Sequence, residues 1–521
     1  MDSPETVRDR LQALPPALLR RLRRGVEKES LRVRHDGSLA LTPHPHALGS
    51  ALAHPHITTD FSESQLELIT GTHETAEDCV RELTEIHQVV YRAIGDEILW
   101  CASMPCGLPE ESAIPIGRYG PSNLGRMKTV YRTGLAHRYG RRMQMICGIH
   151  YNFSLPPAAW AALPGCRNAN DGYFALIRNF RRAAWLLFYL YGASPAVCAS
   201  FVADRRHGLQ PIGQGTLGLP WATSLRMGRL GYQSEAQSTI VASANSLDAY
   251  GTALEEALTR SYAPYEAVGV QGPDGAYRQL ATTLLQIENE FYGKIRPKRR
   301  IRRGERPLHA LRERGVEYVE VRLMDLDPFE PVGISAQTMR FLDVFLLACL
   351  AADSPADTPE ELAEIARNQE TVAARGREPG LMLERGGRRV PAREWAAQIL
   401  AACAPAAEAL DAAIGASAHR EAHAAAAEAL ADASRTPSAR VLAAMAREHN
   451  ASYVSFALAR SLAHAQRLQT LSLSPAVETR FARLAEQSLA EQAAIEAADT
   501  LPFEEYRRHY LARERLHPGG E

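Results

Sequence analysis

The sequence predicts an α+β protein with a helical C-terminal region. Segments 25–33, 57–69, 149–155 and 315–323 carry apolar side chains broken by single polar ones, as strands covered on one face do. Residues 358–515 are instead rich in Ala, Leu, Glu and Arg at helical spacing, with no detectable repeat. We therefore expect a sheet-bearing region over 1–350 and an Ala-rich helical region over 351–521 that packs on it.

Composition gives no sign of a nucleic-acid or membrane partner. The 521 residues carry a formal net charge of -1, so bulk charge does not favour an anionic polymer or lipid surface. The eight cysteines are scattered without a C-x-x-C pair, which argues against a zinc ribbon or a disulfide framework. We expect reduced thiols and, because the Arg-rich start lacks the apolar core of a secretory signal, a cytoplasmic protein.

One uncharged run, 183–203, is long enough to cross a bilayer. Gly192 and Pro195 break this run in the middle, and small and polar residues follow them. We expect a buried helix that ends near Gly192 rather than a membrane span.

The chain begins with a helical stretch over 1–24, which two prolines divide. The strand 25–33 follows and carries Glu27 and Glu29 two residues apart, so both carboxylates point to the same face. Two like charges side by side repel each other, and a divalent cation would remove that repulsion. For these residues alone, an edge strand whose charges face water is the alternative.

Two further segments place polar residues among apolar ones. In 57–69, Glu67 is an isolated acid beside aliphatic side chains, and 74–98 predicts an amphipathic helix. In 149–155, His150 lies on a polar face while aromatic and aliphatic side chains fill the other. Both segments therefore offer metal-ligating side chains on strands.

The middle of the chain leads to the clearest strand. The sequence is loop-like over 208–236 and helical over 236–262. The strand 315–323 then places Glu320 and Arg322 at neighbouring positions of one face. Such a pair can form an ion pair or a joint site for a metal and a phosphate.

Two sequence patterns suggest phosphate binding. Residues 213–218 match G-x-G-x-x-G, but no clear strand precedes them and Pro220 follows where a helix should begin, so we expect no dinucleotide site. Residues 294–303 carry seven basic side chains in ten, which fits a solvated surface or a nucleic-acid arm. Their position just before the last strand favours a phosphate clamp.

Several charged or polar residues on these strands could share one face: Glu27, Glu29, Asp60, Glu67, His150 and Glu320. For any one of them a structural role is the commoner explanation, but a shared site explains all six together. Oxygen ligands with a single imidazole suit Mg²⁺ or Mn²⁺ better than zinc. Two or three such ions would bridge the phosphates of ATP, with Arg296 and Lys298 of the basic run as further phosphate contacts.

Long, ordered motifs carry a family resemblance. They are GVEKESLRV, ALGSALAHPHITTDFSESQLELIT, SMPCGLP, GRMKTVYR, HYNFSLP, YLYGASPAVCASF, ATSLRMGRLGY, LQIENEFYGKIRPKR and GVEYVEVRLMDLDPF, spread over 25–331, with a brief return over 496–503. On these motifs the chain resembles the glutamate–cysteine ligases of the gammaproteobacterial type. The resemblance implies a fold similar to glutamine synthetase, in which a curved, mostly antiparallel sheet forms a funnel.

The resemblance also implies an activity. The γ-carboxylate of L-glutamate would take the γ-phosphate of ATP, and the amine of L-cysteine would then displace phosphate, in the first step of glutathione biosynthesis. Feedback inhibition by glutathione is implied as well, and we expect a monomer. The alternatives are a ligase of this fold with another amine acceptor, a metal-dependent amidohydrolase, and an interaction scaffold built on the C-terminal helices.

The family's site residues carry over by position in the motifs. The resemblance implies that Glu29, Asp60 and Glu67 hold one metal ion, that Glu27, His150 and Glu320 hold another, and that a third ion is shared. It also implies that Arg322 stabilises the transferred phosphoryl group. The cysteine pocket would be formed by Tyr131, Tyr232 and Tyr292. Arg132 and Arg226 are candidates for the substrate carboxylates, with ordinary surface arginines as the alternative. The segments on either side of Tyr232 depart from the family pattern, which bears on cysteine selectivity.

Overall fold

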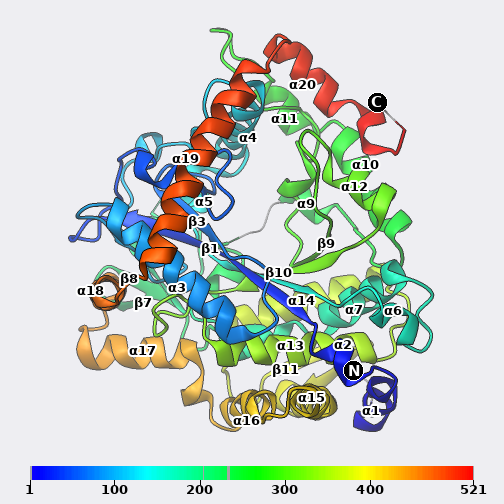
Figure 1. Ribbon diagram of the computed structural model, residues 1–521. Helices are drawn as coiled ribbons and strands as arrows, with labels where there is room; N and C mark the ends of the chain where they lie inside the picture. The colour runs from blue at the N-terminus through cyan, green and yellow to red at the C-terminus, as the bar shows by residue number, and fades with distance from the viewer. Residues whose placement is uncertain (1–2, 204, 232–234, 520–521) are drawn as a thin grey trace.

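An antiparallel sheet forms the centre of the protein (Figure 1). The computed structural model describes residues 3–203, 205–231 and 235–519. The strand order is β2–β3–β1–β5–β10–β9, and β4 pairs with the end of β1. The bounds are Ile57–Thr59 (β2), Gln65–Ile69 (β3), Arg23–Val33 (β1), Ile149–Ser154 (β5), Tyr318–Met324 (β10), Ile295–Lys298 (β9) and Ile98–Leu99 (β4). These pairings are antiparallel, which confirms the predicted α+β fold.

The register of the central strands brings polar side chains together. Glu27 on β1 lies opposite His150 on β5, and Glu320 on β10 lies opposite Asn152 on β5. Directly opposed residues carry their side chains on the same face of a sheet. Residues at the alternate positions, such as Val321 with 0% exposure, fill the other face. One face is therefore polar and the other is core.

Helices cover the apolar face. α3 (Ala76–Ala93) contacts β1 and β3, α7 (Ala169–Ala183) contacts β9, and α8 (Trp185–Tyr191) contacts β10. α13 (Ala336–Ala351) packs against α3 and α7 and presents Asp343 to the sheet. The Asp343 carboxylate accepts a 2.7 Å hydrogen bond from Tyr151 and lies 2.9 Å from Arg24. This buried pair ties α13 to β1 and β5.

The C-terminal helices extend around the sheet region. They are α14 (Pro359–Arg375), α15 (Ala392–Ile414), α16 (Ala418–Ala431), α17 (Pro437–Glu448), α18 (Tyr453–Thr470), α19 (Pro475–Ala497) and α20 (Phe503–Leu511). α15 and α16 pack under α13, and α19 then runs along the flank of the molecule to α20 at the opposite end (Figure 1). The prediction of a helical tail is confirmed. A boundary at residue 350 stays a prediction.

The remaining helices are short or connect the larger elements. They are α1 (Pro4–Gln12), α2 (Pro16–Leu19), α4 (Asn123–Tyr139), α5 (Arg141–Gln144), α6 (Ala159–Ala162), α9 (Glu235–Ser238), α10 (Leu247–Thr259), α11 (Ala263–Val268) and α12 (Pro307–Arg314). α1 and α2 are separated at the two prolines, as predicted. The continuous helix predicted over 236–262 is wrong, because residues 239–246 interrupt it.

Two small sheets were not predicted. β7 (Gln210–Gly213) and β8 (Thr216–Gly218) form a hairpin that pairs with β6 (Ala196–Cys198), within a segment predicted as loop. The G-x-G-x-x-G match lies in this hairpin, so it has no helix to support a dinucleotide, as expected. β11 (Met382–Arg385) and β12 (Arg388–Pro391) form a second hairpin inside the tail predicted as helical.

Two apolar segments bear on membrane insertion. The uncharged run forms the buried α8, which ends at Tyr191 beside Gly192, as predicted. α15 is the one helix of the described chain that is long and apolar enough to span a membrane, and 56% of its most apolar window is buried. It packs against α1, α13 and α16, as a core helix does.

A disulfide corrects the prediction of reduced thiols. Cys106 and Cys198 form a disulfide across a sequence separation of 92 residues. The sequence could not show this pairing, because β6 brings Cys198 beside the loop that holds Cys106 only in the folded chain. The other cysteines of the described chain are free, and most are buried.

Candidate active site

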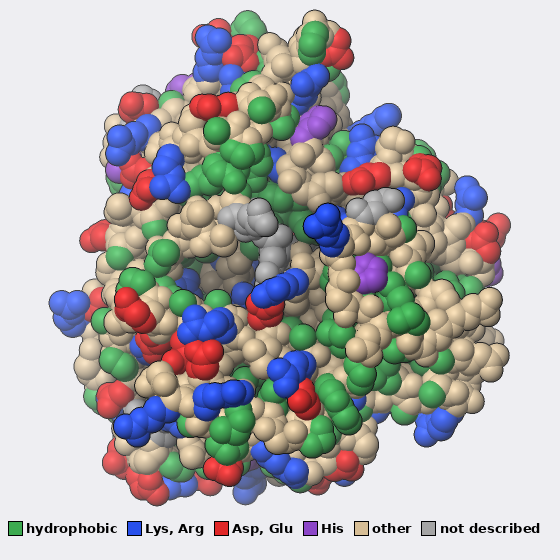
Figure 2. Space-filling view, turned by 180° about the vertical axis from the view of Figure 1, so that it is seen from behind, with side chains coloured by type: hydrophobic (Ala, Val, Ile, Leu, Met, Phe, Trp, Pro, Cys, Tyr) green, Lys and Arg blue, Asp and Glu red, His purple; other side chains and the backbone are tan. Residues whose placement is uncertain are grey.

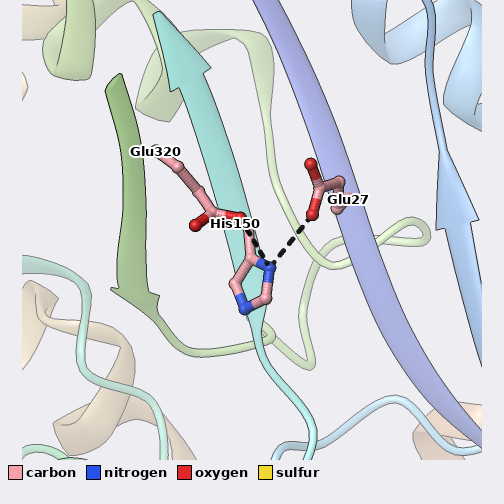
Figure 3. Close-up of side chains that lie close together, drawn as sticks. All are labelled: Glu27, His150 and Glu320. Atoms are coloured by element: carbon pink, nitrogen blue, oxygen red, sulfur yellow. Dashed lines mark hydrogen bonds and ion pairs between the residues drawn. The ribbon is translucent and has the colours of Figure 1, made fainter. Parts of the chain in front are cut away.

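A histidine and two glutamates meet on three neighbouring strands of the polar face. The possible ligand atoms of Glu27, His150 and Glu320 all lie within 4.8 Å of one another. His150 Nδ1 is 3.2 Å from Glu27 Oε2 and 3.7 Å from Glu320 Oε1 (Figure 3). The sequence had placed these residues in one group, and the strand register brings them together.

The protonation of this group fits a divalent cation. Burial opposes the ionisation of Glu320, but Lys298 and Arg322 outweigh it and lower the pKa of its carboxyl. Burial and the charge of Arg322 lower the pKa of His150, which favours the neutral imidazole. Glu320 Oε2 is buried and has no hydrogen-bond partner among the described residues. An ionised carboxylate with an unused oxygen beside a neutral imidazole is a donor set for a hard cation.

A second acidic group lies next to the first. Glu29 on β1 lies opposite Glu67 on β3, and Asp60 follows β2. Glu29 Oε2 accepts a 2.7 Å hydrogen bond from the Gly148 amide. Burial and the Asp60 charge raise the pKa of Glu29 to about 8, and burial and the Glu27 charge raise the pKa of Glu67. The carboxylate oxygens of Glu29, Asp60 and Glu67 do not all lie within 4.8 Å of one another, unlike the ligand atoms of the first group. A cation between these carboxylates would relieve their mutual repulsion.

Arg322 and Lys298 add positive charge beside the first group. Arg322 Nη1 lies 3.1 Å from Glu320 Oε1 and 3.3 Å from His150 Nδ1. Lys298 Nζ lies 3.5 Å from the same glutamate oxygen. Both cations line the cavity above the sheet, so they are positioned to meet a phosphate there.

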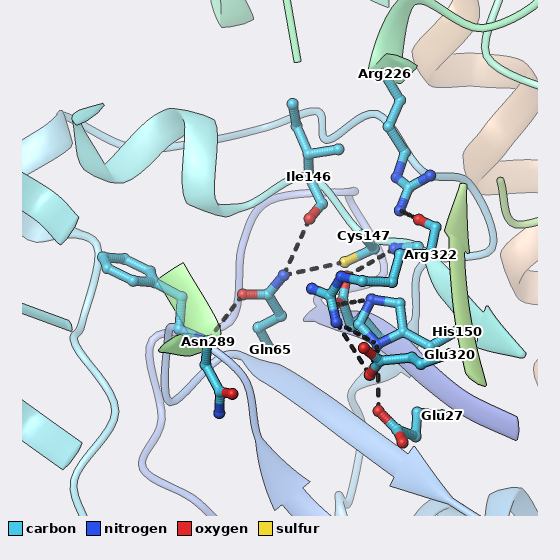
Figure 4. A network of polar contacts seen from close by, with 12 residues as sticks. Glu27, Gln65, Ile146, Cys147, His150, Arg226, Asn289, Glu320 and Arg322 are labelled. Atoms are coloured by element: carbon cyan, nitrogen blue, oxygen red, sulfur yellow. Dashed lines mark hydrogen bonds and ion pairs between the residues drawn. The ribbon is translucent and has the colours of Figure 1, made fainter. Parts of the chain in front are cut away.

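Arg226 and Arg132 are built into the site framework. Arg226 is 1% exposed, which excludes an ordinary surface arginine; it donates a 3.1 Å hydrogen bond to the Arg322 carbonyl and lies 3.6 Å from Asp325 (Figure 4). Arg132 donates to the carbonyl of Asp60 and stacks on the Tyr119 ring at 4.5 Å. Arg226 therefore supports β10, and Arg132 supports the Asp60 loop. Contacts of either with substrate stay predictions.

Arg296 lies deeper than expected. Its guanidinium donates to the carbonyls of Asn289 and Phe291, which fixes it in the wall of the cavity. Burial and the neighbouring Arg322 lower its pKa to about 10. Most of the basic run beyond Lys298 lies at the surface, where Arg302 and Arg303 meet acidic side chains.

Two of the three predicted tyrosines line the same cavity. Tyr131 lies on α4, and the Tyr292 hydroxyl accepts a 3.4 Å hydrogen bond from Gln144. The Tyr292 backbone amide donates to Gln237 Oε1 at 2.9 Å, which holds the segment just before β9 in place. Tyr232 lies outside the described residues.

Two cavities meet at Glu27, one of the three residues of the metal-ligand group. One, of about 370 Å³, lies above the six predicted ligands and includes Tyr131, Tyr292 and Arg322. The other, of about 1050 Å³, is lined by Gly25, Ser154 and Tyr318 and by several arginines. Glu27 lines both cavities. The surface is hollowed on the face shown in Figure 2, where lysine, arginine and acidic side chains border the hollow.

The sequence analysis missed several side chains of this site. Asn152 donates a 2.9 Å hydrogen bond to Glu27 Oε1, and its position two residues after His150 could have indicated that. Gln65 holds the start of β5 by donating to the Ile146 carbonyl at 3.3 Å, as Figure 4 shows. Tyr506 and Tyr510, which also line the smaller cavity, come from the far end of the chain and carried no local signal.

The chain is similar to known proteins along most of its length. A family model described as glutamate-cysteine ligase matches residues 10–372. The glutamate–cysteine ligase of Saccharophagus degradans is 46% identical over 503 residues, which cover 95% of each chain. That of Alcanivorax borkumensis is 47% identical over 513 residues, which cover 96% of this chain and 98% of the relative.

Solved structures show the same fold. The glutamate–cysteine ligase of Francisella tularensis in complex with AMP matches with a TM-score of 0.89 and 36% identity, covering 94% of this chain and 97% of that chain. A bifunctional glutathione synthetase from Pasteurella multocida matches with a TM-score of 0.71 and 26% identity, covering 93% of this chain and 58% of that chain.

Proposed function

Because this chain belongs to the glutamate–cysteine ligase family, we propose that it joins the γ-carboxylate of glutamate to the amine of cysteine at the expense of ATP. This is the first step of glutathione biosynthesis. One observation from the structure carries the proposal most directly. The metal-ligand group of Glu27, His150 and Glu320 lies between two cavities, with the Arg322 guanidinium 3.1 Å from Glu320.

We propose that the two acidic groups hold Mg²⁺, for which Mn²⁺ can substitute. Glu27, His150 and Glu320 would hold one ion, and Glu29, Asp60 and Glu67 a second, with a third shared between them. The donor set supports this, because hard oxygens with one imidazole suit these cations. The bound ions would neutralise the charge of the ATP phosphates.

The two cavities divide the substrates between them. The larger cavity has the size of a cofactor site and a lining rich in arginine, so the nucleotide belongs there, with its phosphates directed past Glu27. The AMP complex of the Francisella relative supports a nucleotide site in this fold. The smaller cavity then receives glutamate and cysteine. Lys298 and Arg296, which line the smaller cavity together with Glu27, would contact the phosphates.

The chemistry then takes two steps. An oxygen of the glutamate γ-carboxylate attacks the γ-phosphorus of ATP, ADP leaves, and γ-glutamyl phosphate forms. The cysteine amine attacks the γ-carbonyl carbon, phosphate leaves, and the amine loses its proton as the amide forms. Arg322 is placed to bind the phosphoryl oxygens through both steps, so the protein contributes position and charge.

Tyr131, Tyr292 and Arg132 line the smaller cavity, which supports a role in substrate recognition. From the family resemblance we assign the cysteine side to Tyr131, Tyr232 and Tyr292, and the substrate carboxylates to Arg132 and Arg226. Glutathione contains the γ-glutamylcysteine product, so it would compete for the same cavity and inhibit. We expect a cytoplasmic monomer.

The test is ADP release from ATP and Mg²⁺ with glutamate, in the presence and absence of cysteine, with the peptide identified by mass. We expect γ-glutamylcysteine in proportion to ADP. Peptide formed with 2-aminobutyrate or simple amines but not with cysteine would show another amine acceptor. Amide hydrolysis without ATP would show an amidohydrolase instead.

A further inference from the structure

Asp325 is a buried carboxylate beside the active site that the proposed reaction does not use. It follows β10 directly and is 4% exposed. Burying a carboxylate is costly unless hydrogen bonds and a nearby positive charge compensate it. The groups that compensate Asp325 therefore indicate what this side chain does in the folded protein.

Three hydrogen bonds fix both oxygens of the Asp325 carboxylate. Oδ2 accepts from the Ala193 amide at 2.8 Å and from the Ser194 hydroxyl. Oδ1 accepts a 3.0 Å hydrogen bond from the Ser224 hydroxyl. Ser194 and Ser224 are 0% and 1% exposed, so water does not compete for these bonds. The carboxylate therefore has a fixed place and a fixed orientation.

The oxygen that Ser224 holds faces the Arg226 guanidinium. Arg226 Nη1 lies 3.6 Å from Asp325 Oδ1, and Arg226 Nη2 donates a 3.1 Å hydrogen bond to the Arg322 carbonyl (Figure 4). Arg226 belongs to a short 3₁₀ turn, Leu225–Met227, which Ser224 caps. The Asp325 carboxylate thus holds both the turn that carries Arg226 and the charged end of its side chain.

Arg226 lies against the segment that holds the metal-ligand residues. Its guanidinium is so close to Gly148 that a Cβ atom there would stand 1.8 Å from Nη2. The Gly148 amide in turn donates to Glu29 Oε2 at 2.7 Å. Arg226 also lines a third, small cavity of about 30 Å³, which shares His150 and Arg322 with the cavity of about 370 Å³. Arg226 is therefore part of the wall around the proposed metal ligands.

The place of Arg226 differs from that of Arg132. Arg132 follows Tyr131 on α4 and lies on the side of the cavity where the acceptor is assigned. Arg226 lies at His150 and Arg322, the end to which the proposed reaction brings the glutamate γ-carboxylate. Under the proposed function, on which this inference rests, the substrate anion that Arg226 would meet is the α-carboxylate of glutamate.

We propose that Asp325 is a positioning residue for the donor substrate, because it fixes the Arg226 guanidinium in the orientation that binds the glutamate α-carboxylate. A guanidinium binds a carboxylate through two parallel N–H donors, so its orientation matters as much as its charge. Asp325 itself does not touch the substrate. Its negative charge also balances the buried charge of Arg226 before glutamate binds.

Asp325→Asn tests this role, because it keeps the shape of the side chain and removes its charge. The KM for glutamate should rise about tenfold, because Arg226 loses the partner that orients it. The KM values for ATP and for cysteine should stay within about twofold of wild type. Initial rates of ADP release at varied concentrations of each substrate give the three constants. An unchanged KM for glutamate overturns the proposal.

A double-mutant cycle shows whether Asp325 acts through Arg226. Arg226→Met removes the guanidinium and should itself raise the KM for glutamate. In that background, Asp325→Asn should raise this KM by less than about twofold further, because the group that Asp325 orients is already gone. A further rise as large as the one in the wild-type background would show a general structural effect and would contradict the proposal.

The matched control is Asp357→Asn. Asp357 is also buried, accepts hydrogen bonds from the Ser243 hydroxyl at 2.7 Å and the Ala244 amide at 2.9 Å, and lies 3.8 Å from Arg181. Because Asp357 lines none of the three cavities, this variant should leave the three KM values unchanged. An equal rise in the KM for glutamate in this variant would rule out a specific role for Asp325.

If Asp325→Asn does not fold, Ser194→Ala gives the same test with a smaller change. This variant removes one hydrogen bond to Asp325 Oδ2 and keeps the charge, so the KM for glutamate should rise about threefold. An unchanged KM in Ser194→Ala then overturns the proposal. A wild-type protein that forms no γ-glutamyl product contradicts the proposed function instead.

Discussion

At the level of single residues, the two acids of β1 differ in their surroundings. Glu27 and Glu29 share a face and both lie beside His150, with Glu27 3.2 Å from Nδ1 and Glu29 3.6 Å from Nε2. Glu27 also accepts a hydrogen bond from Asn152, whereas Glu29 accepts one from the Gly148 amide. Their pKa values are shifted in opposite directions: the hydrogen bond with His150 offsets burial and lowers that of Glu27, whereas burial and Asp60 raise that of Glu29 to about 8. Neighbouring acids therefore meet different environments.

Replacement of either acid tests the two-group assignment. Glu27→Gln and Glu29→Gln should each raise the Mg²⁺ concentration that gives half-maximal ADP release by roughly tenfold or more. The reason is that each substitution removes one anionic ligand. The measurement is a Mg²⁺ titration of initial rates. Glu256→Gln, which alters an exposed ion pair with Arg260 away from both cavities, is the control and should leave the titration unchanged. Wild-type titrations in both site variants would contradict the assignment.

Arg322 tests the phosphoryl-transfer step. Arg322→Ala should bind Mn²⁺ nearly as wild type does, because the six proposed ligands remain, but should lower kcat by about 10³-fold. Paramagnetic titration gives the first quantity and steady-state assays give the second. A near wild-type kcat in this variant would rule out the proposed role.

Elements position these side chains. The alternation in β1, β5 and β10 predicted which residues share a face, and the structure agrees for Glu27, His150 and Glu320. The pairing order of the strands could not be predicted, because it depends on contacts between distant segments. The hairpin of β7 and β8 was missed because its strands are short and its glycines resemble a loop.

The turn after β10 carries a titratable group that affects stability. Burial raises the pKa of Asp327 to about 6, from an ordinary value near 3.8, and its carboxylate accepts a hydrogen bond from the Phe329 amide. A carboxyl with a raised folded-state pKa stabilises the protein while it is protonated. That contribution is full below about pH 4 and is lost as the pH rises through 6.

Asp327→Asn cannot ionise, so the variant avoids the loss of stability above pH 6, and its side-chain amide still offers an acceptor for the Phe329 amide. We therefore compare the Tm of the variant minus the Tm of wild type at two pH values. This difference should be about 2 °C larger at pH 8 than at pH 5. Thermal unfolding followed by circular dichroism measures the difference. The exposed Asp9→Asn is the control and should show none. A difference that is larger at pH 5 would contradict the assigned titration.

At the scale of the whole molecule, the tail packs on the sheet region. α15 and α16 cover α13, and α20 lines the cavity above the six predicted ligands. The sequence predicted the helices of the tail but not their places, because Tyr506 and Tyr510 meet the site only through the path of α19 around the molecule. The Cys106–Cys198 disulfide also escaped prediction, because only the folded chain brings these two distant cysteines together.

Deletion of 358–521 tests this integration. The apolar faces of α13 would be exposed, so the truncated protein should aggregate and lack ADP-forming activity. The soluble fraction after expression and the rate of ADP release measure the outcome. A soluble and active fragment of residues 1–357 would instead support a tail that serves as a separate interaction scaffold.

In the proposed reaction, glutamate is activated as γ-glutamyl phosphate. Glutamate labelled with ¹⁸O in both γ-carboxylate oxygens tests it directly, because the oxygen that attacks ATP leaves with the phosphate. We expect one ¹⁸O atom in inorganic phosphate for each γ-glutamylcysteine formed. Phosphate without ¹⁸O, at the same yield of peptide, would contradict it.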